Sequence, residues 1–147
     1  MITIVMADDH KIVRQGIKTM LESELEFKVL ADVPSGEDAL ILLKSKKPDI
    51  LLTDLKMPGI TGIEVARQAK KISPKTKVII LSMYPDEAYV SEALLAGAFS
   101  YVVKEAGLDV LIHAIRETMA GRRYLSPPIS SEHIISFNPL VKERLKT

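Results

Sequence analysis

The sequence predicts an α/β fold: a doubly wound sheet of five parallel strands covered by five helices. Short apolar runs alternate with segments of helical periodicity, which is the pattern of a parallel sheet with right-handed crossovers. The run at residues 50–52 has no polar alternation, as expected for a strand covered on both faces. The 147 residues, 47% of them hydrophobic, suffice for one core of ordinary size.

The first half of the chain contains two predicted strands and two predicted helices. Residues 2–7 and 27–33 are apolar runs typical of buried strands. Residues 11–25 have the spacing of an amphipathic helix. Ser35 is the expected N-cap of a second helix that ends before Pro48. The apolar residues expected to face the core are Ile12, Val13, Ile17, Met20 and Leu21 in the first helix and Ala39, Leu40, Leu42 and Leu43 in the second.

The central strand leads from the apolar run directly into Asp54, and Pro58-Gly59 then predicts a turn. Thr61 followed by Glu64 has the form of a capping box and opens a helix that extends to about Ile72. The remaining expected elements are a strand at 77–81, a helix from about 86 to 96 closed by Gly97, a strand at 98–103 and a helix at 107–120.

The chain changes character after Gly121. Residues 122–128 indicate a linker, and residues 130–147 indicate a short polar tail with room for one helix. About twenty residues cannot build a further core. We therefore expect one domain at 1–121, followed by a linker and tail at 122–147.

The composition excludes several classes of function. The net charge of +1 does not require a nucleic acid or an acidic partner. The absence of cysteine excludes disulfides, thiolate catalysis and cysteine-based zinc sites. No signal peptide precedes the first strand, and no apolar run is long enough to span a bilayer. A cytoplasmic protein is therefore expected.

Polar groups follow four of the five predicted strands. They are Asp8 and Asp9, Asp54, Ser82, and Lys104. Because the carboxyl ends of parallel strands meet at one edge of a sheet, these side chains should converge. Three carboxylates would repel one another unless a cation joined them. Hard oxygen ligands without thiols favour Mg²⁺.

A presented aspartate beside a metal indicates phosphoryl chemistry, since aspartate can form an aspartyl-phosphate. Asp54 is then the nucleophile, and Lys104 and Ser82 bind phosphoryl oxygens. Taken singly, Asp8 or Asp9 could cap a helix and Lys104 could be a solvated lysine. However, chance would rarely place a suitable group at the ends of four different strands. The four positions together therefore favour a phosphoryl-transfer site. The histidines, His10, His113 and His133, show no ligand spacing and are expected to be ordinary surface or half-buried residues.

These motifs resemble the receiver domain of bacterial two-component response regulators. The matching segments are Asp8-Asp9 and residues 53–59, 81–84 and 97–104, and the resemblance covers residues 1 to about 121. It implies a flavodoxin-like, CheY-like fold. It also implies that a histidine kinase donates a phosphoryl group and that the receiver catalyses only its own phosphorylation and dephosphorylation, without being an enzyme on outside substrates.

The resemblance implies a role for each matching residue. Phosphorylation should draw the switch hydroxyl towards the new oxygens, and the switch aromatic ring should rotate inwards. The implied roles are Asp54 as phosphoacceptor and metal ligand, Asp8 and Asp9 as metal ligands, Lys56 as the donor of a backbone carbonyl to Mg²⁺, Lys104 as the phosphoryl contact, Ser82 as the switch hydroxyl and Tyr101 as the switch aromatic.

Residues 83–87 and 114–127 are similar to the NarL/FixJ (LuxR-type) subfamily, in which a helix-turn-helix DNA-binding domain follows the linker. Residues 122–147 leave no room for that domain. DNA binding and transcription regulation are therefore expected only through an output domain of a full-length parent. A phosphorylation-dependent homodimer is consistent with the subfamily, and no membrane partner is expected.

Two other classes of protein share part of this pattern. Phosphatases or phosphotransferases of haloacid-dehalogenase type also use an aspartate nucleophile with Mg²⁺, but they usually have a second aspartate where this chain has Lys56. A nucleotide-binding module would need a glycine-rich phosphate loop, and the sequence contains none.

Overall fold

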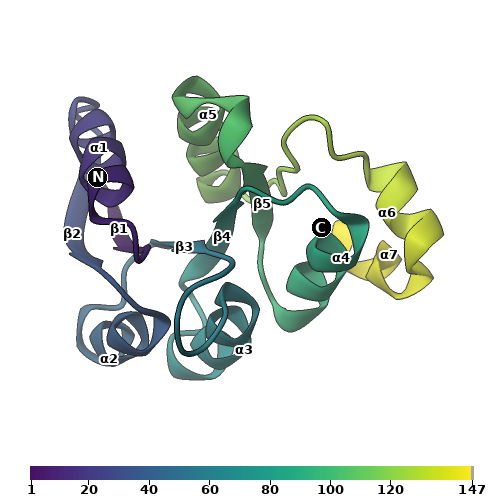
Figure 1. Cartoon of the computed structure of the whole chain (residues 1–147), viewed down its shortest axis with the longest axis horizontal. Helices are drawn as coiled ribbons and strands as arrows, with labels where there is room; N and C mark the ends of the chain where they lie inside the picture. The colour runs from purple at the N-terminus through teal and green to yellow at the C-terminus, as the bar shows by residue number, and fades with distance from the viewer. Residues whose placement is uncertain (147) are drawn as a thin grey trace.

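The computed structural model describes residues 1–146 and shows one sheet between two layers of helices (Figure 1). All five strands are parallel, in the order β2-β1-β3-β4-β5. The predicted fold is confirmed. The strands are β1 (Ile2–Ala7), β2 (Phe27–Val33), β3 (Ile50–Asp54), β4 (Lys77–Ser82) and β5 (Ser100–Val103), and the helices are α1 (Lys11–Glu22), α2 (Gly36–Lys46), α3 (Gly62–Ile72), α4 (Glu87–Ala96), α5 (Leu108–Met119), α6 (Ser131–Phe137) and α7 (Lys142–Leu145), with short 3-10 turns η1 (Lys104–Ala106) and η2 (Pro139–Val141).

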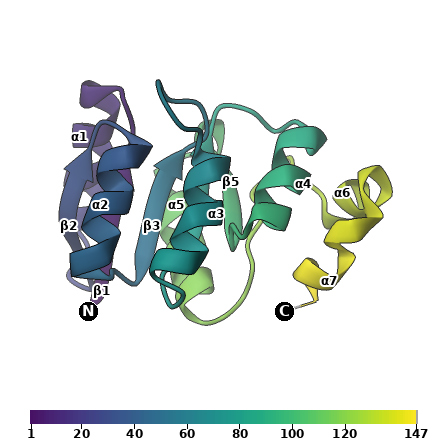
Figure 2. The ribbon, with the colours of Figure 1, turned by 90° about the horizontal axis from the view of Figure 1, so that it is seen from below.

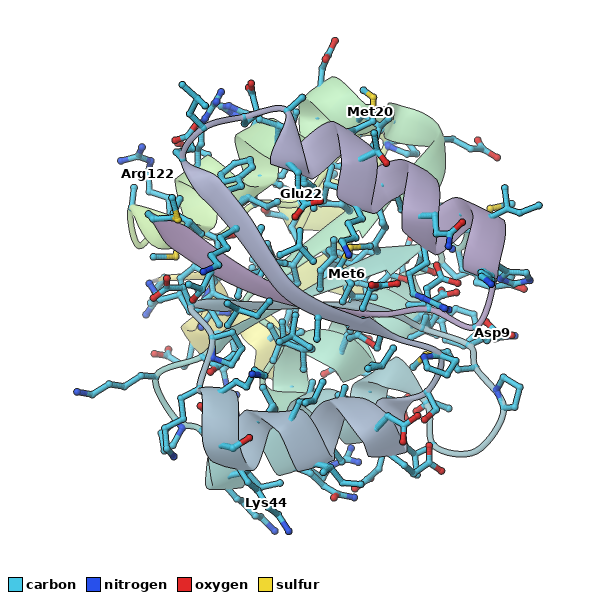
Figure 3. The ribbon with its side chains drawn as sticks, turned by 90° about the vertical axis from the view of Figure 1, so that its left-hand side faces the viewer. Met6, Asp9, Met20, Glu22, Lys44 and Arg122 are labelled. Carbon is cyan, nitrogen blue, oxygen red and sulfur yellow. The ribbon has the colours of Figure 1, made fainter. Side chains whose placement is uncertain are left out.

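The two faces of the sheet have separate cores. α1 and α5 cover one face, and α2, α3 and α4 cover the other (Figure 2). Alternate residues of β1 divide between them, since Val5 belongs to the core under α2–α4 and Met6 to the core under α1 and α5. Figure 3 shows Met6 inside the molecule, whereas Met20 and Lys44 lie on the outer surfaces of the helices. Every residue of β3 is buried, as its apolar run predicts.

Two predicted helix starts are formed by side-chain caps. The hydroxyl of Ser35 accepts the backbone N–H of Asp38, and the hydroxyl of Thr61 accepts that of Glu64. Each bond satisfies one amide that the first helical turn leaves unpaired. Gly97 ends α4 with a positive φ, as expected for a glycine cap.

The first helix is shorter and less covered than predicted. α1 ends at Glu22 rather than Leu25, and only Ile17 and Leu21 are buried. Ile12 is 87% exposed. It lines an apolar hollow between α1 and α5 instead of entering the core. The predicted apolar stripe is therefore wider than the surface that β2 and α5 cover.

The C-terminal segment packs on the domain instead of extending as a tail. It contains two α-helices, which brings the described helices to seven instead of five. Ile134 and Val141 are almost fully buried in the core under α4. Before these helices, the linker pairs with the edge of β5, since Tyr101 donates its N–H to the Tyr124 carbonyl and Ser126 donates its own to the Tyr101 carbonyl. Figures 1 and 2 show α6 and α7 beside α4. None of the helices in residues 1–146 has the length and apolar character to cross a membrane.

Candidate functional site

The carboxyl ends of three strands bring an acid, a second acid and a base together. β1 ends just before Asp8, β3 ends at Asp54, and β5 ends just before Lys104. The Lys104 Nζ lies 3.1 Å from Asp8 Oδ2 and 3.2 Å from Asp54 Oδ2. One ammonium group therefore bridges two carboxylates that would otherwise repel each other.

Burial affects the pKa values of two groups in this cluster. Asp8 is 4% and Asp54 7% exposed. Burial raises the pKa of Asp54, the charge of Lys104 opposes that change, and the charge of Asp8 adds to it. Burial also acts to lower the pKa of Lys104, but the charges of Asp54 and Asp8 outweigh it and hold that pKa above its ordinary value. Lys104 therefore stays an ammonium.

Backbone N–H groups donate to two of the remaining carboxylate oxygens, and a third oxygen accepts no hydrogen bond from the described residues. Asp54 Oδ1 accepts the N–H of Leu55 at 2.7 Å, and Asp8 Oδ1 accepts the N–H of His10 at 2.9 Å. Asp9 Oδ1 is buried and accepts no well-aligned hydrogen bond from residues 1–146, although His10 Nδ1 lies 3.3 Å away. A buried carboxylate oxygen without a donor is costly unless a cation satisfies it.

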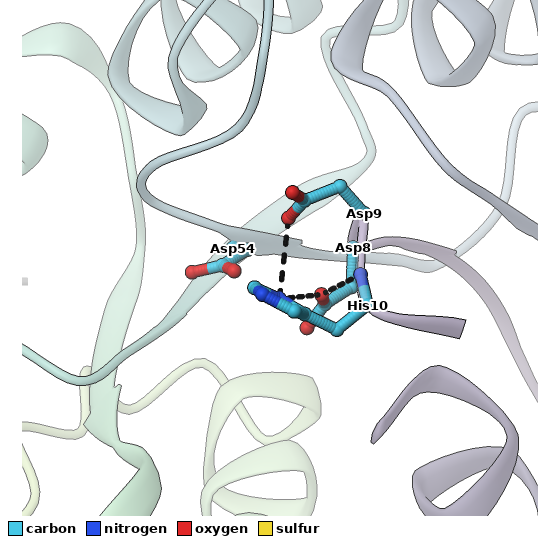
Figure 4. Close-up of side chains that lie close together, drawn as sticks. All are labelled: Asp8, Asp9, His10 and Asp54. Atoms are coloured by element: carbon cyan, nitrogen blue, oxygen red, sulfur yellow. Dashed lines mark hydrogen bonds and ion pairs between the residues drawn. The ribbon is translucent and has the colours of Figure 1, made fainter. Parts of the chain in front are cut away.

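The donor set fits a divalent cation. Asp8, Asp9, His10 and Asp54 each offer one ligand atom, and these atoms all lie within 4.8 Å of one another (Figure 4). Three hard carboxylates suit Mg²⁺, which binds few protein ligands and keeps several waters. The acids are those predicted to hold the metal. The role of the Lys56 carbonyl as a metal ligand stays a prediction.

His10 is a residue that the sequence pattern did not assign to this site. Its Nδ1 lies 3.3 Å from Asp8 Oδ1 and 3.3 Å from Asp9 Oδ1, as Figure 4 shows. His10 is exposed, as expected for a surface residue, but its place beside the acidic pair was not predicted. The available signal was its position directly after the acidic pair, at the N-cap of α1, where a short loop turns its ring back over both acids.

The predicted switch residues meet at the loop after β4. Ser82 is fully buried, and its hydroxyl accepts the N–H of Tyr84 at 2.9 Å. Tyr101 is also fully buried, and its hydroxyl donates to the Tyr84 carbonyl at 2.6 Å. Burial raises the pKa of Tyr101 to about 12, so the phenol stays a hydrogen-bond donor. The Tyr101 ring is thus already buried in this structure, although an inward rotation was predicted only upon phosphorylation.

Comparison with known proteins agrees with this geometry. The model of the response regulator receiver domain matches residues 4–116. The chain belongs to the response regulator receiver family.

The relatives of this receiver include a transcriptional regulatory protein and a response regulator. It is 39% identical over 142 residues to the transcriptional regulatory protein DegU of Brevibacillus brevis, covering 97% of this chain and 60% of that protein. It is 39% identical over 140 residues to the response regulator GacA of Pseudomonas aeruginosa, covering 95% of this chain and 65% of that protein. The receiver thus spans about two thirds or less of the length of these relatives.

Solved structures place the receiver among LuxR-family regulators. A two-component response regulator of the LuxR family from Aurantimonas superposes with a TM-score of 0.86 at 32% identity, covering 95% of this chain and 98% of that one. The signal receiver domain of NarL from Mycobacterium tuberculosis gives 0.79 at 30% identity, covering 82% and 98%. The predicted subfamily is confirmed. These matches do not support the haloacid-dehalogenase alternative, and the exposed Lys56 ammonium lies over the Tyr84 ring rather than supplying a second acid.

Proposed function

We propose that this chain is a phosphoryl-accepting signal receiver in which Asp54 takes the phosphoryl group of a histidine kinase. The observation that supports this best is the Lys104 bridge between Asp8 and Asp54 at a buried sheet edge. A carboxylate oxygen of Asp54 forms the new bond to phosphorus. The bond between phosphorus and the donor histidine nitrogen breaks, and that nitrogen keeps the electron pair.

The neighbouring side chains supply the electrostatics of this transfer. Lys104 already contacts an Asp54 oxygen and can follow the charge onto the phosphoryl oxygens. Asp8 and Asp9 would hold Mg²⁺, with the Lys56 carbonyl as a further ligand. The bound cation would neutralise charge on the transferred group. The Ser82 hydroxyl, buried at the end of β4, would bind one phosphoryl oxygen.

The output would pass through Ser82 and Tyr101. Moving the Ser82 hydroxyl away from Tyr84 frees the loop that the Tyr101 hydroxyl also binds. Phosphorylation would therefore shift the population of loop conformers before α4, and a partner that prefers one conformer would detect it.

The parent protein would use this switch to control transcription. We infer a receiver at residues 1–121 and a linker with a C-terminal segment at 122–147, after which the relatives have further length. DNA binding would belong to an output domain outside this chain, and phosphorylation could drive homodimerisation. A transcriptional regulator works where the DNA is, so we infer a cytoplasmic location.

Intact-protein mass spectrometry after incubation with acetyl phosphate and Mg²⁺ tests the proposal. We expect the gain of one phosphoryl group, lost in Asp54→Asn and in the presence of a chelator. Asp86→Asn is the matched control, because it makes the same chemical change at an exposed acid before α4. Full phosphorylation of Asp54→Asn would contradict the assignment.

A further inference from the structure

A basic cavity lies at the end of the sheet opposite the acidic site. It has a volume of about 420 Å³ and lies between α3, the start of β4, the linker and α7. Among residues 1–146, five cationic side chains line it and no carboxylate does. They are Lys70, Lys75, Lys77, Arg123 and Arg144.

The charges around this cavity are not compensated by acids. None of the five cations forms an ion pair with a carboxylate of residues 1–146. Burial, and then the charge of Arg144, lowers the pKa of Arg123. The charge of Arg144 therefore adds to the cost of keeping the half-buried Arg123 guanidinium charged.

Backbone carbonyls satisfy only part of this hydrogen-bonding capacity. Lys77 donates to the Thr118 carbonyl at 3.2 Å, and Arg123 donates through one terminal nitrogen to the Phe99 carbonyl at 3.2 Å. Such contacts are ordinary for cations near helix C-termini. The Nε of Arg123, however, is buried and has no acceptor within the described chain. This buried N–H is therefore available to an acceptor on a bound ligand.

Two of the cations are held in position by an aromatic ring. The Arg123 guanidinium carbon lies 4.3 Å and the Lys77 Nζ 4.7 Å from the centroid of the Phe99 ring. Cation–π contacts of this kind orient the charges before any ligand arrives. Guanidinium groups offer paired donors that match the oxygens of a phosphate group, and the cavity volume lies in the range of small-molecule sites.

We propose that this cavity binds a small molecule bearing a phosphate or diphosphate group. Three of its cations are far apart in the sequence, since Lys70 belongs to α3, Arg123 to the linker and Arg144 to α7. A bound polyanion would therefore tie the C-terminal segment to the receiver. This inference is independent of phosphorylation at Asp54.

Calorimetric titration of the whole chain with inorganic pyrophosphate tests the proposal. A chelator is included so that no metal ion recruits pyrophosphate to the acidic site. We expect saturable binding with one site, a shift of the Arg123 Nε–H signal in nitrogen-15 NMR, and slower amide exchange in α7. Arg144→Gln should weaken binding about tenfold, the effect of losing one charge-assisted contact.

Matched variants separate a built site from general attraction. Lys142→Gln on α7 and Lys71→Gln on α3 remove the same charge from exposed side chains that do not line the cavity. Both should bind pyrophosphate as the unchanged protein does. Lys70→Gln is a second cavity variant, in case Arg144→Gln loosens α7. Titrations with orthophosphate and ADP show which part of the ligand is recognised. Tighter binding of ADP than of pyrophosphate would identify the ligand as a nucleotide, and equal binding would show that only the phosphate groups are recognised.

Three results would overturn the proposal. One is the absence of saturable pyrophosphate binding at millimolar concentration. Another is equal weakening by the cavity variants and the two exposed-lysine controls. The third is tighter, salt-dependent binding of duplex DNA that shifts the same signals, which would make this face a nucleic-acid surface instead of a small-molecule site.

Discussion

At the carboxyl end of the sheet, two buried carboxylates flank one lysine, whereas the cavity at the amino end gathers five cations and no acid of the described residues. Figure 3 shows Asp9 and Arg122, the chain neighbour of the cavity residue Arg123, at opposite ends of the molecule. Helix N-termini face the first end and helix C-termini the second, so the helix dipoles favour this arrangement of charge. The two ends differ in how their charges are neutralised. Lys104 is a counterion for the acids, whereas, within residues 1–146, the cations of the cavity donate hydrogen bonds only to backbone carbonyls.

Removing the counterion should have the largest effect. Lys104→Gln leaves Asp8 and Asp54 facing each other without a cation and takes away the contact to the transferred group. We expect phosphorylation by acetyl phosphate to slow by about 10²–10³-fold, as for the loss of one preorganised donor. Lys44→Gln, an exposed lysine of α2, is the control and should react normally. A rate within threefold of the unchanged protein would show that Lys104 is not needed.

The basic end depends on the docking of the C-terminal segment. Ile134 is 1% exposed, so Ile134→Ala should destabilise that docking by about 3 kcal/mol, through lost burial and a cavity. Hydrogen exchange of residues 131–145 measures the effect, and pyrophosphate binding should weaken in parallel. Leu140→Ala, at a side chain that is 74% exposed, is the control. Equal exchange in both variants would mean that the segment is not anchored through Ile134.

A glycine supports the acidic end. A Cβ on Gly62 would fall far inside van der Waals contact of the Asp54 carbonyl oxygen, where backbone has to move. Gly62→Ala should therefore lower the free energy of unfolding by about 2 kcal/mol. Gly16→Ala is the control, since Gly16 lies in α1 with open space around it, and there alanine should stabilise by about 0.5–1 kcal/mol. Urea unfolding compares them, and stabilisation by Gly62→Ala would refute the close approach.

The switch tyrosine sharpens the comparison further, because its hydroxyl belongs to neither charged end. Tyr101→Phe removes the hydrogen bond to the Tyr84 carbonyl and should cost about 1 kcal/mol. We expect the phosphorylation rate to stay within twofold while amide exchange quickens at residues 84–86. If phosphorylation falls as much as it does in Lys104→Gln, Tyr101 belongs to the transfer site rather than to its output.

The smallest effect concerns an acid that does have its own partner. The hydrogen bond from Arg14, at 2.8 Å, is the main cause that lowers the pKa of Asp32. A lowered folded-state pKa contributes stability above the unfolded value of 3.8, and this stability is lost as the pH falls through the folded value. Asp32→Asn should remove this part of the acid dependence of urea unfolding, worth less than about 1 kcal/mol. If the unchanged protein and Asp32→Asn lose stability identically as the pH falls, the Arg14–Asp32 pair does not contribute to the acid dependence.

The sequence was sufficient for the acidic end because its residues are defined by where strands stop. Asp54 follows an uninterrupted apolar run, and Lys104 ends a second one, so parallel order alone brings them to one edge. The ring of His10 could not be placed the same way, because a loop rotamer rather than a strand end directs it.

The basic end could not be predicted, since its partners meet only through tertiary packing. α6 has seven residues, too few for its periodicity to show that Ile134 would be buried against α4. The missing acceptor of the Arg123 Nε depends on which groups surround it after folding. Ile12 is the opposite case. The apolar spacing predicted helix α1 correctly, but it did not show that Ile12 would stay exposed on the helix.

The pairing of the linker with β5 also has a consequence during synthesis. The strand leaves the ribosome before Tyr124 and Ser126, whose backbone bonds close its outer edge. At a translation rate of about 5–20 residues per second, that edge stays open for on the order of seconds. An open strand edge can pair with another nascent chain. Variants that delay the arrival of Ser126 should therefore lower the yield of native protein more than its final stability.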